Sequence, residues 1–181
     1  MRPQQEAPGS QWLKLKDKLL WATGAFYQRQ TRDPEGGTVI YVNMKRYEFF
    51  NHTADVGIRI FGSNLAELFE NAGFALFDII TDIAQVRERE MRCITVTRDS
   101  VDELLVEWLS QLLYLNATEL LLCHKFHIRE IAQQRLTGEA WGEIFQDHRH
   151  VIKTEVKAVT YHGLSVYEEN GLWKATVVLD V

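Results

Sequence analysis

The sequence predicts an α+β fold in which two amphipathic helices pack on a largely antiparallel β-sheet. Two capped helical patterns start at Asn64 and Ser100, and after Asn116 the apolar residues follow a period of two. This order of elements lacks the strict strand–helix alternation of a parallel sheet. The pair Asn170-Gly171 is a strong signal for a β-hairpin near the end of the chain.

The bulk composition is that of one folded domain with an appendage. The chain has 181 residues, of which 46% are hydrophobic and 25% charged. Its longest apolar runs fall short of the roughly 20 residues that span a bilayer, so we expect no membrane association. Residues 44–181 contain 14 Lys or Arg and 21 Asp or Glu, a balance of −7. Direct binding to nucleic acid is therefore not expected, and a role in RNA metabolism would require a protein partner.

The first part of the chain differs from the rest. All three prolines lie in residues 1–43, and the segment 12–21 has a loose helical spacing of apolar residues with interleaved lysines. That segment suits a docking or membrane-surface helix, a targeting sequence, or an extension with no folded role. A regular domain pattern begins only at Met44. We therefore interpret 1–43 as an N-terminal extension, flexible or upstream of the true start, and 44–181 as the domain.

The domain begins with two expected strands and a helix. One strand covers 46–49, and a second covers 56–61, where apolar and other residues alternate. Asn64, with Glu67 three residues later, is a capping-box start for a helix. Its apolar face is formed by Leu65, Leu68, Phe69, Ala72, Leu76, Phe77 and Ile80.

A β-branched pattern over 91–97 predicts a third strand, and Ser100 with Glu103 predicts a second capped helix. The apolar face of this helix contains Val101, Leu104, Leu105, Trp108, Leu109, Leu112 and Leu113. Each helix has one apolar stripe and one polar face. We therefore expect both helices to cover one side of a sheet rather than to be buried all round.

The remaining elements are expected to be strands. They cover 123–131, 136–142 and 156–160, followed by a hairpin that begins at Leu164, turns at Asn170-Gly171 and returns over 173–179. The last strand carries the chain to Asp180.

Candidate chemistry lies in the polar segment 52–57 and at the end of the sequence. The carboxylates of Asp55 and Asp180 and the free α-carboxylate of Val181 are three oxygen donors, which hard cations such as Ca²⁺ and Mg²⁺ prefer. Spacing alone does not bring them together. Taken singly, Asp55 fits a turn residue that accepts backbone hydrogen bonds, and Asp180 fits a solvated carboxylate.

Three motifs resemble the archease family over residues 44–181. They are His52-Thr53-Ala54-Asp55-Val56-Gly57, Lys157-Ala158-Val159-Thr160-Tyr161-His162 and Leu179-Asp180-Val181. The resemblance implies a small metal-binding protein that is not itself an enzyme. It also implies an archease-like single domain, with metal ligands at Asp55, Asp180 and Val181.

The resemblance further implies a partner, an RtcB-type RNA ligase of tRNA splicing. Archeases promote guanylylation of this ligase and allow it to turn over many times. The implied cofactor is a divalent metal, Ca²⁺ before Mg²⁺ or Mn²⁺, and the implied location is the cytoplasm.

Two alternatives from other classes remain open. One is a small metal-dependent hydrolase in which Asp55 and Asp180 hold the cation and His52 or His162 acts as base. The other is a chaperone-like scaffolding module. Whether His52 or His162 takes part in the site is also open.

The remaining histidines and the cysteines suggest no further site. His124, His127, His148 and His150 resemble metal ligands only by number, and His148 and His150 are expected to be solvated in a polar loop. Cys93 and Cys123 have no CxxC spacing, so we expect buried free thiols in a reducing cytosol.

Overall fold

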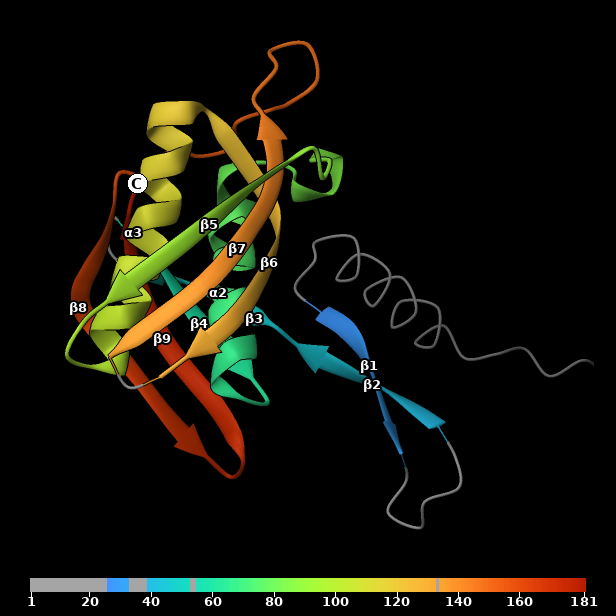
Figure 1. Ribbon diagram of the computed structural model, residues 1–181, viewed down its shortest axis with the longest axis vertical. Helices are drawn as coiled ribbons and strands as arrows, with labels where there is room; N and C mark the ends of the chain where they lie inside the picture. The colour runs from blue at the N-terminus through green and yellow to red at the C-terminus, as the bar shows by residue number, and fades with distance from the viewer. Residues whose placement is uncertain (1–25, 33–38, 53–54, 133) are drawn as a thin grey trace, which may run out of the picture.

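Two helices lie between two antiparallel β-sheets in the computed structural model (Figure 1). The structure describes residues 26–32, 39–52, 55–132 and 134–181. The helices are α2 (Leu65–Ile80) and α3 (Val101–Glu119). The predicted α+β class, with two helices on antiparallel sheet, is confirmed. The helical pattern at 12–21 lies outside the described residues.

The larger sheet joins the start of the domain to its end. Its strand order is β3-β4-β9-β8, so the central strands β4 and β9 come from opposite ends of the domain. The strands are β3 (Tyr47–His52), β4 (Asp55–Gly62), β8 (Ala158–Glu169) and β9 (Leu172–Asp180).

The smaller sheet has the order β5-β7-β6 and covers the other side of the helices (Figure 1). Its strands are β5 (Glu90–Thr97), β6 (Leu121–Ile131) and β7 (Arg135–Ile144). A short 3₁₀ helix, η1 (Ile83–Gln85), lies between α2 and β5.

Both helices start at the predicted caps. The side chain of Asn64 accepts a hydrogen bond of 2.9 Å from the amide of Glu67, and the Glu67 carboxylate accepts one of 2.5 Å from the amide of Ser63. The Ser100 hydroxyl caps α3 in the same way, accepting from the amide of Glu103 at 3.2 Å. These contacts satisfy amides that have no partner within the helix.

The expectation that both helices would cover one side of a sheet was wrong, because they lie between two sheets (Figure 1). α2 keeps a partly exposed polar stripe at Glu67, Glu70 and Asp78. The rest of this helix is buried, and even Asn71 is only 6% exposed, its amide donating to the carbonyl oxygen of Phe61 at 2.8 Å. Gly73 permits the close approach of β6, since a Cβ there would lie 2.9 Å from Cδ1 of Phe126. The indole of Trp108 donates to the carbonyl oxygen of Phe69 at 3.1 Å and so joins α3 to α2.

The strands expected at 156–160 and from Leu164 form one strand, β8. Its pairing with β9 is irregular between Thr160 and Ser165, where Gly163 has a φ of +64°. The predicted turn is confirmed, with φ of 53° at Asn170 and 74° at Gly171. Positive φ at both central residues is the pattern of a type I′ turn.

Two strands of the described region precede the domain pattern. They are β1 (Phe26–Arg32) and β2 (Val39–Lys45), which pair with each other as a separate two-stranded ribbon (Figure 1). Sequence analysis predicted no strand here, and β2 crosses the boundary drawn at Met44. Within the described residues, no helix is long and apolar enough to cross a membrane.

Candidate metal centre at the ends of β4 and β9

The topology of the larger sheet brings Asp55 and Asp180 to the same place. Asp55 is the first residue of β4 and Asp180 the last residue of the neighbouring β9. The antiparallel register pairs Val56 with Leu179, and one further step places Asp55 opposite Asp180. Residues opposite each other on antiparallel strands have Cβ atoms about 5 Å apart. The two carboxylates that the sequence singled out therefore share one edge of the molecule.

Strand alternation decides which way these aspartates face. Leu179, Val177 and Ile58 are fully buried in the core between the sheets. Asp55 and Asp180 stand at alternate positions, so they belong to the opposite, outer face of the sheet.

The outer face beside Asp55 is packed by an aromatic ring. Gly57 is paired with Phe50, and a Cβ on Gly57 would lie 2.2 Å from Cζ of that ring. The guanidinium carbon of Arg59 stacks 4.6 Å from the centre of the same ring. Gly57 therefore leaves room for a ring that covers the strand next to the candidate ligand.

The third predicted donor, Val181, is held by Lys157. The ammonium of Lys157 donates to the main-chain oxygen of Val181 at 2.9 Å and lies 3.9 Å from Oδ1 of Asp180. The amide of Lys157 also donates to the carbonyl oxygen of Asp180 at 2.9 Å. The side chains of Lys157 and Asp180 are 59% and 50% exposed, so this corner is open to solvent.

The donor chemistry of this corner fits a hard cation. Two carboxylates and a main-chain oxygen are ligands that Ca²⁺ and Mg²⁺ accept, and solvent access lets water complete the coordination. The part of the chain that the structure describes holds no group of three or more His, Cys, Asp or Glu side chains placed to bind a metal. The candidate centre has only two such side chains, and its third donor is main-chain. Metal ligation by Asp55, Asp180 and Val181 remains a prediction.

The histidines lie in different surroundings. His52 is the register partner of Asp55, and its side chain is outside the described part. His162 is exposed on β8, four residues beyond Ala158, the partner of Asp180.

His124 and His127 each face a carboxylate. Nε2 of His124 lies 3.7 Å from Oε1 of Glu88, and burial lowers the pKa of this imidazole. Nδ1 of His127 lies 3.2 Å from Oε1 of Glu70.

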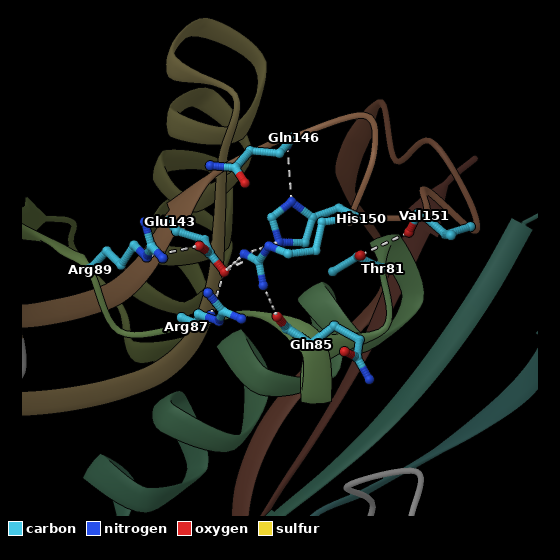
Figure 2. Close-up of polar contacts among 9 residues, drawn as sticks. Thr81, Gln85, Arg87, Arg89, Glu143, Gln146, His150 and Val151 are labelled. Atoms are coloured by element: carbon cyan, nitrogen blue, oxygen red, sulfur yellow. Dashed lines mark hydrogen bonds and ion pairs between the residues drawn. The ribbon is translucent and has the colours of Figure 1, made fainter.

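A buried charged cluster around Glu143 was not predicted. Figure 2 shows Arg87, Arg89 and His150 around the Glu143 carboxylate. Oε1 of Glu143 accepts a hydrogen bond of 2.7 Å from the amide of Arg87, lies 3.3 Å from Nε2 of His150 and forms an ion pair with Arg149. Glu143 is 2% and His150 4% exposed, so the expectation of a solvated His150 was wrong. His148 is exposed as expected.

The Glu143 cluster ties the segment between β7 and β8 to the chain after α2. Arg149 donates to the carbonyl oxygen of Gln85 at 2.9 Å, and the Thr81 hydroxyl donates to that of Val151 at 2.8 Å (Figure 2). Burial disfavours the charged form of Glu143. The hydrogen bonds from Arg149, the Arg87 amide and His150 outweigh this and lower the pKa of its carboxyl. Its contacts within the chain make the cluster a structural anchor.

Both cysteines are free, as expected, but only Cys123 is buried. Burial raises the pKa of its thiol to about 12. The expectation was wrong for Cys93, which is exposed on β5. Ile94 and Val96 take the inward positions of that strand, so its alternation turns Cys93 outward.

Fold and site together define a small α+β protein with an acidic corner where β4 and β9 meet. The model of the Archease protein family matches residues 47–181, and the chain belongs to that family. The resemblance predicted from three short motifs is thereby confirmed.

Relatives from archaea agree with this assignment. A protein archease from Sulfurisphaera tokodaii is 40% identical over 140 residues, which are 76% of this chain and 100% of that protein. One from Methanothermobacter thermautotrophicus is 40% identical over 141 residues, with the same shares. The solution structure of Methanobacterium thermoautotrophicum protein 1598 superposes with a TM-score of 0.68 at 40% identity, covering 76% of this chain and 100% of that one.

Proposed function

We propose that this protein is a metal-binding accessory protein that activates an RtcB-type RNA ligase in tRNA splicing and RNA repair. Its divalent cation would be held by Asp55, Asp180 and a main-chain oxygen of Val181. The observation that supports the proposal is the pairing of Val56 with Leu179, because Asp55 and Asp180 are the next residues of β4 and β9 at the same edge of the sheet, in a chain of the archease family.

The electrostatics of the corner support a bound cation. Neighbouring carboxylates repel each other, and a divalent ion offsets that repulsion. Ca²⁺ is the preferred candidate because it takes six to eight oxygen ligands in flexible geometry and tolerates several waters. Mg²⁺ and Mn²⁺ are the alternatives. When bound, the cation would supply a concentrated positive charge at an otherwise acidic edge.

The partner follows from the family resemblance and from charge. Residues 44–181 have 14 basic and 21 acidic side chains, which disfavours direct contact with an RNA backbone and favours contact with a protein. The corner either positions a cation in the ligase pocket or docks there and favours the conformation that accepts guanylate. In both cases the protein contributes no catalytic residue of its own. Two free cysteines suit a reducing, cytoplasmic setting.

A multiple-turnover RNA ligation assay tests the proposal. An RtcB-type ligase is kept well below the RNA concentration, and product is followed with and without this protein. We expect stimulation that Asp55→Asn and Asp180→Asn each reduce at least tenfold, because each change removes a charged donor at nearly constant shape. Asp147→Asn is the matched control, since Asp147 is exposed between β7 and β8.

Calorimetric titration with Ca²⁺ and Mg²⁺ separates metal binding from activation. The same two variants should lose calcium affinity while their circular dichroism spectra stay unchanged. Full stimulation by the Asp55→Asn, Asp180→Asn double variant would rule out the metal centre and favour a scaffolding role. If the folded, unaltered protein does not stimulate a matched ligase, the proposed activation is wrong and the metal-dependent hydrolase becomes the favoured function.

A further inference from the structure

The Lys157 ammonium lies beside two of the three proposed metal donors at this corner. The ammonium nitrogen lies 2.9 Å from the main-chain oxygen of Val181 and 3.9 Å from Oδ1 of Asp180. Two of the three proposed donors therefore already face a positive charge that belongs to the chain itself.

The main chain, more than the flexible side chain, fixes this position. The amide of Lys157 donates to the carbonyl oxygen of Asp180 at 2.9 Å, which ties the start of β8 to the end of β9. Pairing of Ala158 with Asp180 continues the same ladder. The ammonium can therefore leave the oxygens by rotation of its side chain while the backbone stays in place.

The preceding segment is anchored as well. The amide of Lys153 donates to the carbonyl oxygen of Ile80 at 2.8 Å, and its ammonium donates to that of Asp78 at 2.9 Å. Thr81 and Ile152 form an isolated β-bridge. Residues 152–157 are thus anchored to the end of α2 at one end and to β9 at the other, and this fixes Lys157 beside the acidic corner.

We infer that Lys157 is a tethered counter-cation of the metal centre, so that binding of a divalent cation is an exchange with the Lys157 ammonium. This inference rests on the proposed metal-binding function and deepens it. Calcium–oxygen distances are about 2.3–2.6 Å, so an ammonium hydrogen-bonded to the same oxygen competes with the ion for it. The two positive charges also repel each other at this separation.

The consequence is that Lys157 lowers the affinity of the corner for a divalent cation. In the metal-free protein Lys157 partly neutralises the carboxylates and stabilises the corner. In the metal-bound protein the ammonium is displaced into solvent, which its 59% exposure permits. The site therefore binds its cation more weakly and releases it more readily than the same donors would without the lysine, as suits a protein that presents a cation to a partner.

Calcium titration of Lys157→Met tests the role of the charge. Met keeps most of the length of the side chain and removes the ammonium. We expect the calcium dissociation constant to fall about tenfold at low ionic strength, which corresponds to about 1.4 kcal/mol. The difference should shrink at high salt because the corner is exposed to solvent. Lys157→Arg, which keeps the charge, should bind calcium as the unaltered protein does.

Thermal unfolding without metal gives a second readout that needs no ligase. Lys157→Met should lower the melting temperature of the calcium-free protein by about 1–3 °C, since the change removes one exposed ion pair. Saturating calcium should remove or reverse that deficit. In an Asp180→Asn background the calcium-free deficit should become smaller.

The outcomes separate the two proposals. Equal or weaker calcium binding by Lys157→Met, with normal binding by the unaltered protein, overturns the counter-cation role and leaves the metal centre standing. Absence of calcium, magnesium and manganese binding by the unaltered protein overturns both.

Discussion

At the scale of single residues, a buried carboxylate stabilises a fold only while its partners are present. Glu143 is 2% exposed, and its Oε1 receives the Arg87 amide at 2.7 Å, the Arg149 guanidinium and the His150 imidazole. Taking one partner from such a group leaves the others buried without compensation. The cluster thus holds the segment between β7 and β8, which in turn leads to Lys157.

Glu143→Gln should destabilise the protein by about 2–4 kcal/mol at pH 7, because it leaves Arg149 and His150 facing a neutral amide. Urea unfolding measures the loss. Glu130→Gln is the control, since Glu130 is exposed on β6 and its loss should cost less than about 0.5 kcal/mol. Equal effects of the two changes would contradict the anchoring role.

The contacts of Glu143 also predict that the stability of the protein depends on pH. The contacts lower the pKa of folded Glu143 below its ordinary value of 4.5. A lowered pKa means that the carboxylate contributes its full stability above about pH 4.5 and loses it as the pH falls toward the folded pKa. The stability gap between the unaltered protein and Glu143→Gln should therefore narrow below that pH, and a constant gap would count against this assignment.

At the scale of elements, the smaller sheet depends on a close approach of two strands. Gly142 on β7 is paired with Cys123 on β6, and a Cβ on Gly142 would lie 1.8 Å from the main-chain oxygen of Leu122. The obstacle is backbone, so no side-chain rotation relieves it. Gly163 differs: its φ is +64°, and a Cβ there would meet nothing within 4 Å.

Gly142→Ala should therefore cost more than about 3 kcal/mol, because β6 and β7 must separate. Gly163→Ala should cost only about 1 kcal/mol for its left-handed backbone. Chemical denaturation of both variants gives the comparison. Similar costs would show that the sheet relaxes around Gly142 more easily than its geometry implies.

Local signals predicted the elements well. Asn64, Ser100 and Asn170-Gly171 each lie where a cap or turn was expected, since these features depend only on neighbouring residues. The division of the strands into two sheets, with α2 between them, could not be read from periodicity. The apolar residues of α2 pack against both sheets. All three strands of the smaller sheet follow α2 in the sequence, so the pattern of the helix alone does not reveal that sheet.

At the scale of the whole molecule, the candidate site depends on pairing between the two ends of the domain. The register of β4 with β9 is set by buried residues such as Ile58 and Val177, which face each other in the core. Composition could suggest oxygen donors at Asp55 and Asp180 but not their convergence. The family motifs supplied that link, while the contacts of Lys157 depend on the pairing of β8 with β9, which no motif shows.

The same long-range pairing defines how much of the chain the fold needs. Among the residues whose side chains the structure describes, which start at Lys45, the buried core begins at Tyr47, whose hydroxyl donates to Asp78 at 2.5 Å. Arg46 stacks 4.3 Å from the Phe74 ring, and the family match starts at residue 47. The described strands β1 and β2 pair with each other and not with either sheet of the domain.

Removal of residues 1–43 should therefore leave the melting temperature within about 2 °C of the full chain, as measured by circular dichroism, because a 1 kcal/mol change corresponds to about 2–4 °C at this size. The control removes residues 1–50, which deletes Tyr47 and most of the edge strand β3. That chain should unfold cooperatively only at a much lower temperature or not fold at all. A drop of more than about 5 °C on removal of 1–43 alone would mean that the extension packs on the domain and that the boundary at Met44 is wrong.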